Sequence, residues 1–276
     1  MSDFKKVFFI LYIFALAGCT NLKDVRDYAS ESAKLSAYTE LTTRFRDTYT
    51  REQFYIPNRP DILTQAQAND KRRKAAYEDL LKIHYSVSLY MKTLAVLAGD
   101  DTFDLSKNID SLAGDIQAHP EFGINEGHVD AIFKISKIIT KEITHVYQES
   151  AVRNMIKEGD APLQTTLNGM LDLVRLYKKT NYNEKKMVLG FFETNTSKDK
   201  LVSALARVHI HSLKAGYDDA ELKYDDAEKG IKSIAEGHKK LFDNVNKLSN
   251  DEVIVFVKKI AQDIKEIREN LQAVHE

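Results

Sequence analysis

A heptad repeat runs through residues 210–248, which read IHSLKAGYDDAELKYDDAEKGIKSIAEGHKKLFDNVNKL. Inside it the pentapeptide YDDAE occurs at 217–221 and again seven residues later at 224–228. The two positions that repeat every seven residues hold Ile210, Tyr217, Tyr224, Ile231, His238 and Val245, and Leu213, Ala220, Ala227, Ile234, Leu241 and Leu248. Apolar and small residues at this spacing predict a long helix with coiled-coil-like packing, extending about 58 Å at 1.5 Å per residue.

The overall composition also favours helices. The 276 residues include only 11 glycines and 4 prolines, while 43% are hydrophobic and 29% are charged. Glycine and proline together make up about 5% of the chain, against an average of about 12%. A many-stranded sandwich or barrel would need a turn about every 8–12 residues, and this chain is poor in turn residues. The formal net charge of -1 argues against a nucleic-acid partner, because such proteins usually carry a basic excess.

Helix boundaries are marked by proline, glycine and capping residues. Gly159 and Asp160 are expected to end one helix and cap the next, with Pro162 in its first turn. Ser249 and Glu252 fit a capping box that would begin the last helix. The apolar periodicity then predicts helices over about 22–51, 61–98, 105–117, 128–157, 161–192 and 251–271, besides the heptad helix.

The predicted fold class is all-α. We expect an elongated helical bundle of about six or seven helices, with a long coiled-coil-like helix near 200–248. Residues 19–276 would form a single elongated domain. The stretch 99–127 has the least regular pattern, so a subdivision there is left open.

The N-terminus has the anatomy of a secretory signal. Lys5 and Lys6 precede the apolar run VFFILYIFALA at 7–17, and small residues follow it. As a helix this run would extend about 17 Å, well short of the roughly 30 Å of a hydrocarbon core.

The end of this segment, Leu16-Ala17-Gly18-Cys19, resembles the lipobox of bacterial lipoproteins. The resemblance implies that residues 1–18 are a signal peptide removed just before Cys19. It also implies that the thiol of Cys19, the single cysteine of the chain, carries a diacylglycerol and that the new amino terminus is acylated, for example by palmitate. Two or more acyl chains attach a protein stably, so membrane lipid is an expected partner. The resemblance covers residues 1 to about 21 and implies nothing about the fold.

The residue after the cysteine bears on location. In enterobacterial lipoproteins an aspartate there favours retention in the inner membrane, whereas this chain has Thr20 followed by Asn21. The resemblance therefore implies an outer-membrane lipoprotein facing the periplasm, if the host is Gram-negative. No second apolar stretch approaches 18 residues.

Metal sites are not predicted. Glu142 and His145 have the E-x-x-H spacing of di-iron bundles, but that chemistry needs two such motifs and two further carboxylates. His209 and His211 would point about 200° apart on a helix, so they could not bind the same metal ion. We expect no metal and no cofactor.

Three other charged groups have a functional and a structural interpretation. The doubled aspartates could bind a cation, but we favour a solvated acidic face for Asp218, Asp219, Asp225 and Asp226. The basic cluster could touch anionic lipid, but we favour a solvated face for Lys71, Arg72, Arg73 and Lys74. The loop residues could bind a ligand, but we favour no site for His119, Glu121, Glu126 and His128.

His238 is the one plainly polar residue at the repeating positions. A polar residue there commonly fixes the register of a coiled coil, and a histidine could also sense pH. We predict a partner-binding role for Tyr217, Tyr224 and His238 if this seam faces another chain. A seam buried within one chain would instead indicate a monomeric bundle.

Function is predicted mainly from location and shape. The sequence has no G-x-S-x-G, H-E-x-x-H, P-loop or G-x-G-x-x-G motif, so we expect no enzyme and no catalytic residue. We predict a lipid-anchored envelope lipoprotein that acts as a non-enzymatic helical scaffold or binds an envelope protein. Two alternatives are a protective lipoprotein of the immunity or exclusion type, which sequesters a toxin or blocks a secretion apparatus, and a small-ligand sensor with a pocket between helices.

Overall fold

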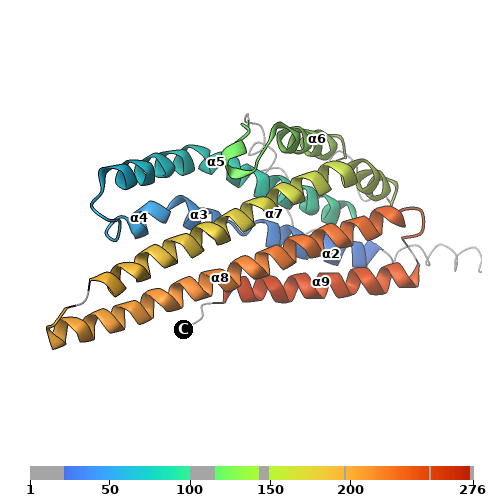
Figure 1. Ribbon diagram of the computed structural model, residues 1–276. Helices are drawn as coiled ribbons and strands as arrows, with labels where there is room; N and C mark the ends of the chain where they lie inside the picture. Colours follow the sequence, from blue (N-terminus) through green and yellow to red (C-terminus); the bar gives the residue numbers. More distant parts are fainter. Residues whose placement is uncertain (1–21, 100–115, 143–148, 196, 249, 274–276) are drawn as a thin grey trace, which may run out of the picture.

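The computed structural model describes residues 22–99, 116–142, 149–195, 197–248 and 250–273, and its regular structure there is helical (Figure 1). The predicted all-α bundle is confirmed. Within these residues, six helices have 15 residues or more: α2 (Leu22–Ser36), α5 (Pro60–Leu97), α6 (Glu126–Glu142), α7 (Glu149–Thr194), α8 (Lys200–Asp243) and α9 (Asp251–Gln272). Three short elements join them: α3 (Glu40–Arg46), α4 (Thr48–Glu52) and the 3-10 helix η2 (Pro120–Phe122).

The two longest helices, α7 and α8, form an antiparallel pair along the length of the molecule (Figure 1). α9 returns along α8, and α2 lies between α9 and α5, while α6 packs on α7 and α5. From Tyr217 onward the heptad seam of α8 is buried inside this bundle. The helix ends at Asp243 rather than near 248, yet Val245 and Leu248 in the following turn remain buried.

The predicted helix over 22–51 is three helices in the structure. α2 ends at Ser36, and the chain turns through residues 37–39 before α3. The change of direction has a packing reason. Leu35 packs against α8 at Gly230, whereas Phe45 in α3 stacks on Tyr177 of α7, with ring centroids 4.5 Å apart. Local periodicity was the same on both sides of the break, so it did not reveal the turn.

The predicted break at Gly159 and Asp160 is wrong, because α7 runs without interruption from Glu149 to Thr194 with Pro162 inside it. Gly159 marks a close helix crossing instead. Tyr90 of α5 lies so near that a Cβ on Gly159 would overlap its hydroxyl and ring. Pro162 removes one backbone donor, and its own carbonyl accepts a bond from the Thr166 hydroxyl at 2.9 Å.

Two other expectations concern the ends of segments. Asn250, not Ser249, caps α9, because its side-chain oxygen accepts from the backbone N–H of Glu252 at 2.9 Å. Ser249 itself lies outside the described residues, as does most of the short helix expected at 105–117. Beyond that gap, Ile124 is fully buried in the same core as the long helices.

The close crossing at Gly159 gives a testable prediction. Gly159→Ala should lower the free energy of unfolding by about 1–3 kcal/mol, because overpacking against Tyr90 outweighs the gain in helix propensity. Gly216→Ala is the matched control: that glycine is also helical, has no neighbouring atom within 4 Å of an added Cβ, and should gain about 0.5–1 kcal/mol. Urea unfolding measures both. Equal gains for the two variants would show that the helices do not cross this closely.

Candidate functional site

His238 lies at the centre of a buried hydrogen-bond network that joins three helices. Its Nδ1 is 3.0 Å from Oδ1 of Asp160 in α7, and its Nε2 is 2.9 Å from the hydroxyl of Tyr90 in α5. The Tyr90 hydroxyl donates to the carbonyl oxygen of Met155 at 2.9 Å. His238 and Tyr90 are fully buried and Asp160 is 8% exposed. The network therefore fixes how α5, α7 and α8 sit against one another.

The two ring nitrogens of His238 face Asp160 on one side and Tyr90 on the other. The Tyr90 hydroxyl, which donates to the carbonyl of Met155, also lies within hydrogen-bond distance of Nε2 of His238. The carboxylate of Asp160 accepts from Nδ1 on the other side. Burial raises the pKa of Asp160, but the hydrogen bond and the positive charge of His238 outweigh burial and leave that pKa below its ordinary value. A buried pair of this kind is costly to break, since the remaining charge would be unpaired.

A carboxylate, an imidazole and a hydroxyl in hydrogen-bond contact also make up the catalytic triads of hydrolases. Here the arrangement has no access for a substrate, because His238 and Tyr90 have no exposed surface. The hydroxyl is also committed to a backbone carbonyl. The network of Asp160, His238 and Tyr90 therefore holds α5, α7 and α8 together.

Tyr217 and Tyr224 are buried as well, with 4% and 2% of their surface exposed. The Tyr217 hydroxyl donates to Glu184 at 2.8 Å, and Arg51 binds both carboxylate oxygens of Glu184 at 2.8 Å. Burial raises the pKa of Tyr217, and it raises that of Tyr224 to about 12. Tyr217, Tyr224 and His238 therefore face their own chain. The partner-binding role predicted for them is corrected to a role in the intramolecular core.

The other charged candidates mostly form surface or interhelical contacts. His209 lies 3.0 Å from the Tyr55 hydroxyl, and His211 is exposed. The doubled aspartates pair with lysines; for example, Lys178 of α7 binds Asp225 of α8 at 2.6 Å. These acidic residues thus bridge α7 and α8 as well as facing solvent.

The expected solvated face at 71–74 is partly wrong. Arg73 is only 7% exposed, and its guanidinium lies 5.8 Å from the ring centroid of Phe45. Four consecutive residues of a helix point in four directions, so one of them faced the bundle.

The loop at 119–128 serves packing. His119 pairs with Asp79 at 2.9 Å, and His128 packs on Gly169. Among the residues that the structure describes, no group of three or more His, Cys, Asp or Glu side chains could hold a metal ion. Glu142 is buried at the end of α6, while His145 lies outside the described residues. The segment with Leu16, Ala17, Gly18 and Cys19 also lies outside them.

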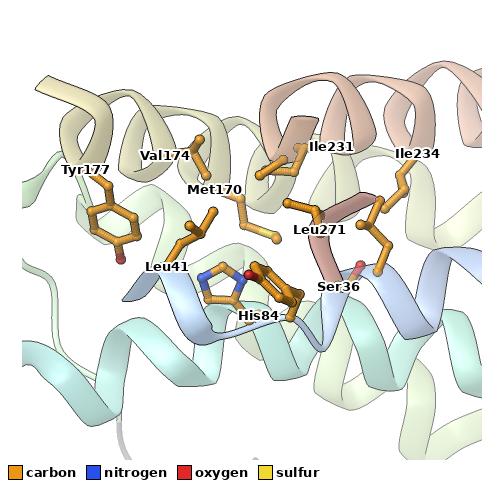
Figure 2. Close-up of a pocket in the computed structure, with 12 residues that line it drawn as sticks. Ser36, Leu41, His84, Met170, Val174, Tyr177, Ile231, Ile234 and Leu271 are labelled. Atoms are coloured by element: carbon orange, nitrogen blue, oxygen red, sulfur yellow. The ribbon is translucent and has the colours of Figure 1, made fainter. Parts of the chain in front are cut away.

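A small cavity lies between α2, α3, α5, α7, α8 and the end of α9 (Figure 2). Figure 2 shows His84, Met170 and Tyr177 around the same space, with Leu41 and Ile231 among the apolar residues that line it. It offers about 20 Å³, enough for about one water molecule. Pockets for small ligands are typically about 300–1,000 Å³, so this space does not hold one as it stands.

Burial in this part of the core lowers the pKa of His84 to about 4. Its Nε2 lies 3.0 Å from the hydroxyl of Thr42, which satisfies the neutral ring. Protonating the ring would place a charge in an apolar setting.

The pH dependence of stability should reveal His84. Its folded pKa is about 4 and its ordinary value is 6.5, so the unfolded chain gains the proton first as pH falls. Stability from this group is full above about pH 6.5 and decreases by about 3 kcal/mol as pH falls to 4. Unfolding measured at several pH values should show a shallower decline for His84→Gln. His211→Gln, at an exposed histidine, is the control; equal declines for all three proteins would contradict the assignment.

An exposed apolar stripe marks the start of α8. Leu201, Val202, Leu205 and Val208 are 50–72% exposed, and no residue from 201 to 216 is buried. We call residues 185–216, the end of α7 and the start of α8, the tip hairpin. The stripe lies outside the heptad seam, because these four residues occupy positions that face away from Ile210 and Leu213. The heptad positions therefore do not include the stripe, although its spacing i, i+4, i+7 is present in the sequence.

The tip hairpin is also basic. It contains six lysines and arginines against two acidic residues, a net charge of +4 within a chain of net charge -1. At its inner side, Tyr55 packs on the rings of Phe191 and Phe192, each with a centroid distance of 5.5 Å. The inner side of the hairpin is therefore packed by aromatic rings, and its outer side carries the exposed aliphatic stripe.

No helix in the described part of the chain is long and apolar enough to span a membrane. Comparison with protein-family models, with curated proteins and with solved structures finds no match to this chain.

Proposed function

We propose that this chain is a bacterial envelope lipoprotein, held in a membrane through acylated Cys19, and that it acts as a non-enzymatic helical scaffold. It would present the tip hairpin to a partner on the side away from its anchor. The observation that carries this proposal is the position of the two ends: α2 begins at Leu22, three residues after Cys19, at the end of the bundle opposite the tip hairpin (Figure 1).

Contacts along α8 establish this direction. Tyr28 packs beside Gly237 and Leu35 beside Gly230. Further on, Tyr55 reaches His209. The N-terminal segment therefore follows α8 from its C-terminal end towards its N-terminal end, and α8, with 44 residues, is about 65 Å long.

Two features support a scaffold over an enzyme or a ligand sensor. The acid–base groups that the core brings together, Asp160 and His238, are buried, with the His238 ring fully so, and they hold helices in place. The apolar cavity has room for about one water molecule. Binding would then take place on the outer surface, where the stripe of the tip hairpin is the largest run of exposed aliphatic residues on one helix in the described part of the chain. A protective lipoprotein that blocks a toxin or a secretion apparatus would use the same surface.

The anchor is tested by Cys19→Ala. This variant should lose labelling by radioactive palmitate and should either stay as uncleaved precursor or leave the membrane fraction. Processing and fractionation of whole cells measure the outcome. A Cys19→Ala protein that is still cleaved and membrane-bound would refute the anchor.

A matched variant separates lipidation from sorting. Thr20→Asp retains Cys19 and should remain lipidated, but in an enterobacterial host it should move from the outer to the inner membrane. Separation of the two membranes by density measures this shift. Loss of labelling in Thr20→Asp would contradict the prediction, because the lipidated atom is unchanged.

A further inference from the structure

We propose that the tip hairpin binds an anionic lipid surface. The binding itself depends only on residues 185–216. The claim that this surface belongs to a second membrane, away from the anchor, rests on the proposed function.

The apolar part of the surface is one stripe on one helix. Leu201, Leu205 and Val208 recur at i, i+4 and i+7, with Val202 beside them, and so they point to one side of α8. Leu201 and Val208 are 69% and 72% exposed. Aliphatic side chains gathered in water on one face mark a site of contact with a partner or a membrane.

Basic residues lie beside this stripe. Lys198, Lys200 and Arg207 lie within the same turns of the chain. The acidic residue among them, Asp199, is used by the helix itself, because its carboxylate accepts from the backbone N–H groups of Leu201 at 2.7 Å and Val202 at 3.1 Å. A short apolar face flanked by basic residues is typical of helices that lie on anionic membranes.

Charge and side-chain type favour lipid over protein. Two copies docked tip to tip would bring two net charges of +4 together, which disfavours a second copy as the occupant. Protein interfaces rely on aromatic and arginine anchors in matching pockets. This stripe has four aliphatic residues and no aromatic residue, and a fluid lipid surface can accommodate them without a shaped pocket.

The distance between the two ends allows one molecule to join two surfaces. Leu22 lies at one end of the bundle and the tip hairpin at the other, separated by about the length of α8, roughly 65 Å. A chain anchored at Cys19 would therefore hold a second anionic surface at about this spacing.

Vesicle capture tests the proposal with the full chain. The protein is placed in donor vesicles of phosphatidylcholine, and labelled acceptor vesicles contain phosphatidylcholine and phosphatidylglycerol in equal parts. The donors are loaded with sucrose so that they sediment while free acceptors stay in the supernatant, and the sedimented donors should carry acceptors down at low salt and lose them at high salt. Acceptors of phosphatidylcholine alone should not be recovered.

Three variants locate the binding surface. Lys198, Lys200 and Arg207 changed together to glutamine should weaken capture about a hundredfold, from the loss of three headgroup attractions. Leu205→Gln with Val208→Gln should weaken it about tenfold or more. The control is Leu222→Gln with Val255→Gln, two similarly exposed aliphatic residues outside the tip hairpin, which should capture acceptors as the parent does. Circular dichroism confirms that each variant is folded.

The outcomes separate the two proposals. Absence of capture by the parent, equal capture of neutral acceptors, or full capture by the tip variants would overturn lipid binding by the tip hairpin. In the first case a protein partner becomes the occupant to seek. Release of the chain from the donor vesicles would instead count against the anchor. Released chain that is found bound to the acceptors would still support lipid binding by the tip hairpin.

Discussion

The hydrogen bonds of His238 are the constraint on which the packing of the long helices depends. One ring joins Asp160 of α7 to Tyr90 of α5, and both distances are about 3 Å. Tyr90 and His238 are fully buried and Asp160 nearly so, and a shift of any of the three helices by one residue would therefore leave buried polar atoms unpaired. Gly159 and Gly237 let the surrounding rings come close enough, because Tyr90 and Tyr28 occupy the space that a Cβ would take. Apolar packing alone would tolerate a slipped register; this network does not.

The fold could be predicted where local periodicity and tertiary packing agree. The heptad in α8 predicted a buried seam, and from Tyr217 to Leu241 that seam is buried. Prediction failed where a distant contact decides the structure. Nothing near Ser36 in sequence specifies that the chain must turn so that Phe45 reaches Tyr177. Gly159 carries the local signature of a helix end, but its role is to admit Tyr90 from another helix.

The candidate site shows the same division. The sequence identified His238 as unusual, because it interrupts an apolar seam, but its partners Asp160 and Tyr90 lie 78 and 148 residues away. The exposed stripe at Leu201 and Val208 was visible as spacing alone, yet spacing does not say which of two apolar faces is covered. The structure shows that α7 packs on the heptad seam of α8, and that no other described part of the chain covers the stripe at Leu201 and Val208.

That second face needs an explanation outside the core. Sixteen residues, 201–216, extend α8 by about 24 Å without a buried side chain, so they add little to the apolar burial that stabilises the bundle. Exposed leucine and valine on such an extension favour aggregation unless something covers them. The basic residues beside them keep the surface hydrated in the free protein and attract the anionic surface that would cover it. The bundle and the tip therefore have different roles: the bundle buries its apolar residues together with the His238 network, and the tip hairpin leaves apolar residues exposed.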